Sequence, residues 1–94
     1  MINNRYNENE LNNIIYRFDM LNKIYNKDIN YRYMNLECIS ISKSIYFNIR
    51  FKTYIKSNLE LKRLFRSNLK NCLINYKIPK KRKKYLINLI NFIQ

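Results

Sequence analysis

The stretch "LELKRLFRSNLKNCLINYKIPKKRKKYLINLI", residues 59–90, carries the strongest fold signal of the chain. Its apolar residues recur at intervals of three and four, which is the spacing that places side chains on one face of a helix. Pro79 interrupts the pattern, because proline disfavours helical geometry in the residue before it and suits the first turn of a new helix. The stretch therefore predicts two helices, over about 58–76 and 80–92.

The first of these helices is expected to begin with a capping box in "SNLE", residues 57–60. In this motif the Ser57 and Glu60 side chains each accept a hydrogen bond from the other residue's backbone N–H. One apolar face is expected on each helix. The first face consists of Leu61, Leu64, Phe65, Leu69, Cys72, Leu73 and Tyr76, and the second of Leu86, Leu89, Ile90 and Ile93, with Tyr85 at its edge.

Residues 31–56 support two interpretations. The segment "IYFNIRFK", residues 45–52, alternates apolar and polar side chains, which is typical of a half-buried strand whose polar face would carry Arg50 and Lys52. One side of a helix would instead collect Ile41, Ile45, Ile49 and Ile55. We expect a short strand or extended segment over 38–52.

The N-terminal part predicts an amphipathic helix over about 8–26. Its apolar stripe consists of Leu11, Ile14, Ile15, Phe18, Leu21, Ile24 and Tyr25. Glu8 and Glu10 lie at the end where the helix macrodipole favours negative charge. We expect this neutral helix to pack on the core or on a neighbouring protein, in a mainly α, small helical protein with residues 1–94 as a single small domain.

Charge is distributed unevenly along the chain. Residues 1–40, the expected packing helix and turn, contain five cations and five anions, whereas residues 41–94 contain fourteen cations and one anion, Glu60. The second part therefore carries the whole net charge of +13. Five of its cations, Lys80 to Lys84, open a helix at the end where the macrodipole disfavours positive charge. A polyanionic partner for residues 41–94 would offset this repulsion.

The familiar kinds of catalytic site lack their residues. The chain has no histidine to act as a base for Ser or Cys, and no glycine to build a phosphate-binding loop. We therefore expect a binding or structural protein that is not an enzyme and has no cofactor or small-molecule substrate. Cys38 and Cys72 lie far apart in the sequence, so we expect no metal site and two buried, reduced thiols.

The composition indicates an AT-rich genome such as that of an organelle. Asn occurs 17 times and Ile 15 times, whereas Ala, Val, Gly, His and Trp are absent. No apolar run approaches the roughly 18 residues of a membrane span. The N-terminus resembles neither a signal peptide nor a transit peptide. We expect an organelle-encoded protein of the mitochondrial matrix, without a transmembrane segment.

Cations and aromatic side chains occur together in residues 41–94. Lys and Arg neutralise phosphates, while Tyr and Phe stack on exposed bases. Because lysine dominates, we expect contacts to the RNA backbone in preference to base-specific contacts. The candidate RNA-binding residues are Arg50, Lys52, Lys56, Lys62, Arg63, Arg66, Lys70, Lys77, Lys80, Lys81, Arg82, Lys83 and Lys84.

Residues 59–94 resemble small-subunit ribosomal protein fourteen in either of two mutually exclusive registers. In one, "LELKR" (residues 59–63), Pro79, Arg82 and the leucines that follow resemble the E-x-x-R and later Pro, Arg and Leu positions of that family's N-terminal helical half. In the other, Leu64, Arg66, Ile78-Pro79 and the following lysines resemble its RNA-binding C-terminal half. The family's C-x-x-T-G-R segment, its glycines and its terminal Ser-Trp are missing.

Charge, composition and resemblance lead to one expected function and one alternative. We expect a structural constituent of a mitochondrial ribosome, in the small subunit. It would bind ribosomal RNA through its basic helices and neighbouring ribosomal proteins through the helix over 8–26. The alternative is an accessory subunit of a mitochondrial respiratory complex or ATP synthase at the matrix face, where lysines contact anionic lipid such as cardiolipin.

Overall fold

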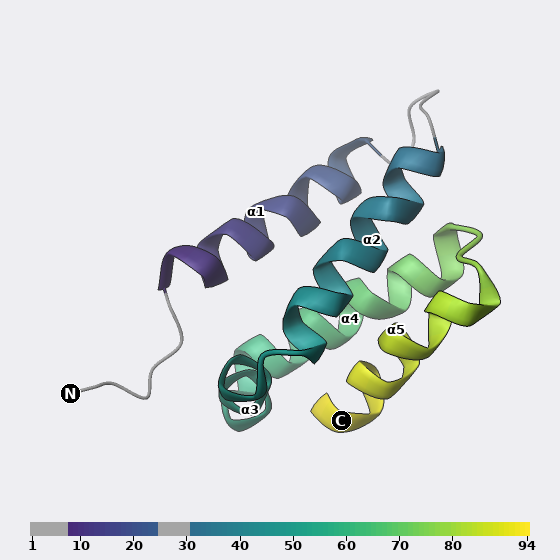
Figure 1. The fold of residues 1–94 in the computed structure, drawn as a ribbon. Coiled ribbons are helices and arrows are strands. Elements are labelled where there is room, and N and C mark those ends of the chain that lie inside the picture. Colours follow the sequence, from purple (N-terminus) through teal and green to yellow (C-terminus); the bar gives the residue numbers. More distant parts are fainter. Residues whose placement is uncertain (1–7, 25–30) are drawn as a thin grey trace.

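The computed structural model describes residues 8–24 and 31–94, and within these ranges it contains helices and no strand (Figure 1). The mainly α fold expected from the sequence is therefore confirmed. The helices are α1 (Glu8–Ile24), α2 (Tyr31–Tyr46), α3 (Ile49–Ser57), α4 (Leu59–Asn75) and α5 (Lys80–Ile93). Three of them, α1, α4 and α5, match the expected helices closely, although residues 25 and 26 of the first lie outside the described residues.

The helices pack around a core that is shared by all five. Figure 1 shows α2 and α4 lying between α1 on one side and α5 on the other, with the short α3 at the end of the bundle where α2 finishes. Phe65 of α4 is fully buried and makes edge-to-face ring contacts with Phe18 of α1 at 5.5 Å and with Phe51 of α3 at 6.1 Å between centroids. These aromatic contacts join α1 and α3 to the centre of the protein.

The expected apolar faces are largely buried. All four inward residues of α5 are buried, and so are Phe65, Leu69 and Cys72 of α4 and Tyr76, the residue that follows α4. Leu64 is an exception because it lies on the flank of α4 that borders a surface groove along α1. The buried residues of the α1 stripe are Leu11, Ile14, Phe18 and Leu21, while Ile15 is half-buried and the Ile24 and Tyr25 side chains lie outside the described residues.

The strand expected over 38–52 is wrong, because the segment spans the end of α2 and the start of α3. Of the alternating apolar residues, Ile45 and Phe51 are buried, but Phe47 and Ile49 are exposed. The alternation of apolar and polar residues arises because the apolar stripe of α2 ends, and that of α3 begins, within this segment. Asn48 makes the break between the two helices, since its side-chain oxygen accepts a hydrogen bond from the Phe51 N–H at 3.0 Å and caps α3.

The expected capping box is shifted by one residue. Asn58, and not Ser57, caps α4, with its side-chain oxygen accepting from the Leu61 N–H at 3.1 Å. The Ser57 hydroxyl instead donates to the Tyr54 carbonyl in the last turn of α3. With a single residue between α3 and α4, Ser57 already belongs to the preceding helix, so it has no freedom to cap the next one.

The prediction that the two cysteines are reduced is also wrong, although both are buried as expected. Cys38 of α2 and Cys72 of α4 form a disulfide, with their Cα atoms 6.0 Å apart. Their side chains are 0% and 2% exposed. A separation of 34 residues in the sequence gave no hint of this pairing, because the contact depends on how α2 and α4 pack.

Candidate nucleic-acid interface

The Lys80–Lys84 run, which we call the basic pentad, occupies the start of α5. Pro79 precedes it and supplies no side-chain cap, and the Pro79 carbonyl accepts hydrogen bonds from the Arg82 and Lys83 N–H groups at 2.9 Å each. The first turn of α5 contains no acidic residue. The pentad therefore concentrates positive charge at a helix end that already has a positive partial charge.

The turn before the pentad is held in place from α2. The Asn35 side-chain amide donates to the Lys77 carbonyl at 2.7 Å, and Ile78 is buried. Exposed Lys77 and Pro79 lie on either side of this anchored residue. The start of α5 is thus fixed relative to the bundle, and the pentad has a defined position.

The helical period places most of the pentad toward solvent. The buried face of α5 is formed by Leu86, Leu89 and Ile93, and Lys80, Lys81 and Lys84 are exposed away from it. Arg82 is also exposed, because it lies beyond the end of that apolar face. Half-buried Lys83 points to the α4 side, where it lines a surface depression of about 480 Å³ together with Leu73 and Ile74.

The cations of α4 continue this basic surface. Arg63, Arg66 and Lys70 follow one another at intervals of three and four, so they share one flank of the helix. The opposite flank, with Leu64 and Asn68, faces α1. Lys62 is half-buried on the cationic side. The α4 cations therefore lie away from α1, and Lys70, the last of them, lies one turn before Leu73, which lines the depression beside Lys83.

Two cations of α3 join the surface from the other side of α5. The Lys52 Nζ atom lies 4.7 Å from the ring centroids of both Tyr46 and Phe92, and the Lys56 Nζ atom lies 4.8 Å from that of Phe92. Such contacts between cations and ring faces are favourable. Arg50, the remaining candidate on α3, lies on the opposite flank of that helix and does not join them.

One contributor was absent from the candidate residues. The Lys43 Nζ atom lies 5.2 Å from the Tyr85 ring centroid, and the Lys84 Nζ atom lies 5.4 Å from the same centroid. Lys43 is the one charged residue in 38–49, so no run of cations draws attention to it in the sequence. Its contact with Tyr85 depends on how α2 packs on α5.

Two acidic residues, Asp19 and Glu37, form ion pairs on the other side of the bundle, around α1. Arg17 of α1 donates two hydrogen bonds to Glu37 of α2, at 2.9 Å from Nε and 2.6 Å from Nη2, and Lys23 pairs with Asp19 at 3.0 Å. Within residues 8–24 and 31–94, no cation from Lys43 onward forms an ion pair. The positive charge around α5 is therefore not neutralised by the described part of the chain.

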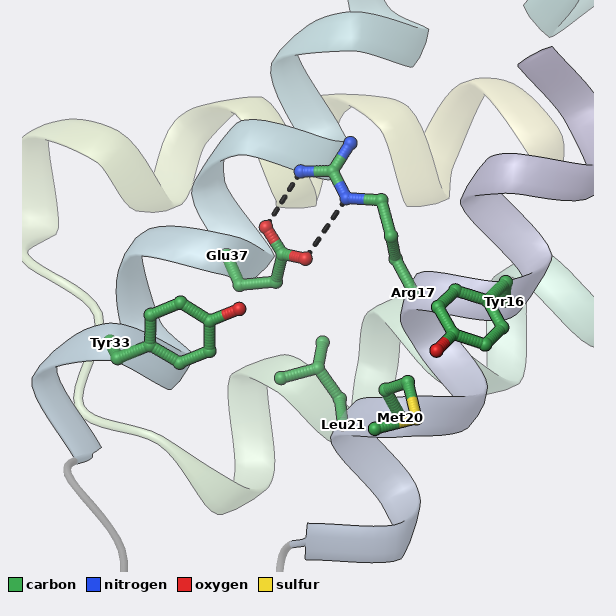
Figure 2. A pocket seen from close by; sticks show the side chains of 6 residues that line it. All are labelled: Tyr16, Arg17, Met20, Leu21, Tyr33 and Glu37. Atoms are coloured by element: carbon green, nitrogen blue, oxygen red, sulfur yellow. Dashed lines mark hydrogen bonds and ion pairs between the residues drawn. The ribbon is translucent and has the colours of Figure 1, made fainter.

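A shallow pocket between α1 and α2 lies on this other side (Figure 2). Its volume of about 230 Å³ is below the roughly 300–1,000 Å³ typical of small-molecule sites. Figure 2 shows the Arg17 guanidinium and Glu37 carboxylate facing each other beside the rings of Tyr16 and Tyr33. Hydrogen bonding to Glu37 raises the pKa of Arg17 above its ordinary value, although burial lowers it. The charged groups of this pocket thus serve mainly to join two helices.

The Glu37→Gln variant is expected to lower the free energy of unfolding by about 1–2 kcal/mol, because it breaks a bidentate, partly buried ion pair. Urea denaturation measures the change. The matched control is Asp19→Asn, which breaks the exposed Lys23 pair within α1 and should change stability by only a few tenths of a kcal/mol. Equal effects of the two substitutions would show that the Arg17–Glu37 pair does not hold α1 on α2.

Two other kinds of site are absent from the described residues. Among them, no group of three or more His, Cys, Asp or Glu side chains is arranged to hold a metal ion. None of the helices in residues 8–24 and 31–94 combines the length and the apolar character that crossing a bilayer requires.

Comparison with known proteins adds no relative. No protein-family model matches the chain, and neither the curated proteins nor the solved structures contain a match. Charge, burial and geometry are therefore the properties that bear on its function.

Proposed function

We propose that this chain is a structural protein of a mitochondrial ribosome whose basic surface lies on ribosomal RNA, in the small subunit. The observation that carries the proposal is the basic pentad, which is anchored at the start of α5 and forms no ion pair within the described residues. Maintaining five adjacent cations at a positive helix end is unfavourable in isolation. Phosphates would remove the repulsion and accept hydrogen bonds from the first backbone N–H groups of the helix.

The proposed RNA footprint is the surface around α5. It comprises the basic pentad and exposed Lys77, together with Arg63, Arg66 and Lys70 on one flank of α4. It also includes Lys52 and Lys56, whose Nζ atoms lie against the Phe92 ring. Rigid helices present these cations, so the surface can match the shape of a folded RNA backbone without a large cost of ordering. Lysine outnumbers arginine on it, which favours point contacts with phosphates over bidentate contacts with bases.

The proposed contact with a neighbouring ribosomal protein lies on the α1–α2 side. The apolar stripe of α1 is used in the core of this protein, so a partner would bind other residues. Tyr16 and Met20 of α1 and Tyr33 and Leu36 of α2 are exposed there. Exposed aromatic and methionine side chains are enriched at protein interfaces. Together with the AT-rich composition, this division into a basic and a neutral side supports an organelle-encoded ribosomal protein.

Sedimentation of an epitope-tagged chain from an organelle lysate tests the proposal. We expect the chain to move with ribosomal particles at moderate salt and to be released by ribonuclease or by high salt. Absence from ribosomal particles would overturn the proposal. Association with membranes that detergent releases and ribonuclease does not would also overturn it, and would favour the alternative in which the lysines contact anionic lipid.

A further inference from the structure

Three aromatic rings meet at the junction between α2 and α3, beside α5. The ring centroids of Tyr46 and Phe47 are 5.0 Å apart, those of Tyr46 and Tyr85 are 5.5 Å apart, and those of Phe47 and Tyr85 are 5.7 Å apart. Each ring thus touches both of the others. We call Tyr46, Phe47 and Tyr85 the ring cluster.

Phe47 is the exposed member of the ring cluster. It follows the last residue of α2, where its N–H donates to the Lys43 carbonyl at 3.0 Å, and it precedes the α3 cap Asn48. Its side chain is 68% exposed, whereas Phe51 and Phe65 are fully buried. The backbone of a helix end and two neighbouring rings therefore hold a large apolar side chain in place without covering it.

Cations surround the ring cluster. Lys43 and Lys84 approach the Tyr85 ring, and Lys52 approaches the Tyr46 ring. The carboxylate of Glu10 also lies at this junction, where it accepts a hydrogen bond from the Asn48 side-chain amide at 3.1 Å. The surroundings of Phe47 therefore combine an uncovered ring with an excess of positive charge.

A polar side chain lies on the same face of α5 as Tyr85. Asn88 is exposed, and on α5 it lies three residues after Tyr85 and four before Phe92, so it shares their face of the helix. An amide side chain can donate to and accept from the edge of a base. In a bilayer the same amide would have to give up its hydrogen bonds to water, which is unfavourable. This favours a nucleic acid over a lipid surface as the partner of the ring cluster.

We propose that the ring cluster binds an unpaired base of single-stranded RNA, which stacks on Phe47 while Lys43, Lys52 and Lys84 contact the flanking phosphates. This inference rests on the proposed RNA-binding function and adds a place where the protein distinguishes single-stranded from double-stranded RNA. In a duplex the bases are already stacked on one another, so a single exposed ring has no free base face to contact.

The test compares Phe47→Ala with the wild-type chain in binding to a short single-stranded RNA and to the same RNA annealed into a duplex. We expect the substitution to weaken single-strand binding about tenfold or more and to leave duplex binding and the salt dependence unchanged, since no charge is removed. A 2-aminopurine in the single strand should report stacking on the wild-type chain, and this signal should be lost in the variant.

Two variants serve as controls. Ile49→Ala removes an apolar side chain of similar exposure, 62%, that lies outside the ring cluster, so it should leave both affinities unchanged. Phe47→Trp keeps a stacking face and should retain single-strand binding. Circular dichroism checks that each variant folds, which is expected because both positions are exposed.

Several outcomes would overturn the inference. If Phe47→Ala weakens single-strand and duplex binding equally, or leaves both unchanged, the ring does not stack on a base. The proposed RNA-binding function would still stand in that case if RNA binding depends steeply on salt. If the wild-type chain binds neither RNA, both proposals fail. If the substitution abolishes binding to vesicles of phosphatidylcholine and cardiolipin but not to RNA, the ring cluster is a lipid contact.

Discussion

Reduction of the Cys38–Cys72 disulfide is expected to lower the free energy of unfolding by about 3–4 kcal/mol. The bond closes a loop between residues 34 apart in the sequence, and in the chain-entropy account a loop of this length restricts the unfolded state by about that amount. The total stability of small domains is only about 5–15 kcal/mol. The reduced chain should therefore unfold at a much lower urea concentration than the oxidised chain.

Reduction is a cleaner change than substitution, because it leaves every side chain in place apart from the bond. Urea denaturation followed by circular dichroism, with and without a phosphine reductant, measures the difference. The Cys38→Ala/Cys72→Ala variant is the control, since the reductant should not affect it. Equal urea midpoints of the wild-type chain under both conditions, or two titratable thiols in the chain prepared without reductant, would contradict the prediction.

The buried position of the disulfide also affects where it can persist. Disulfides are common in oxidising compartments and rare in reducing ones. Here both sulfur atoms are shielded inside the bundle, so a reductant can reach them only when α2 and α4 separate. In reducing surroundings, the lifetime of the bond is thus set by the rate at which the bundle opens.

Local sequence patterns predict the parts of the fold that depend on local geometry. Helix α5 is the clearest example, because Pro79 marks its start and the spacing of Leu86, Leu89, Ile90 and Ile93 identifies its buried face. The middle of the chain could not be assigned in this way. A break at Asn48 combines the end of one apolar stripe with the start of another, and the result imitates a strand.

The candidate site was predictable to a similar degree. The basic pentad is visible in the sequence because its cations are consecutive, and the structure exposes four of the five. The contacts of Lys43 and Lys52 with rings from other helices depend on packing, so no sequence pattern signals them. The same holds for the ring cluster, whose members Phe47 and Tyr85 lie far apart in the sequence.

The charge-neutralised variant Lys80→Gln/Lys81→Gln/Arg82→Gln/Lys83→Gln/Lys84→Gln is expected to bind RNA about a thousandfold more weakly near 0.1 M salt. Each cation that contacts a phosphate contributes about 0.7–0.9 to the slope of the logarithm of affinity against the logarithm of salt concentration. The slope should therefore become shallower by about 3.5–4.5 if the whole pentad lies on RNA. Fluorescence anisotropy of a labelled ribosomal RNA fragment over a series of salt concentrations measures both quantities.

Without RNA the same variant is expected to be more stable than the wild-type chain, by about 1 kcal/mol, because it removes like charges from one turn and cations from the positive end of α5. Affinity and stability should thus change in opposite directions, and this separates lost RNA contacts from lost folding. A variant with Lys→Arg at positions 80, 81, 83 and 84 keeps every charge and should retain the slope. An unchanged slope in the glutamine variant would mean that the pentad faces solvent in the complex, and the repulsion at the start of α5 would then have no compensation from phosphate.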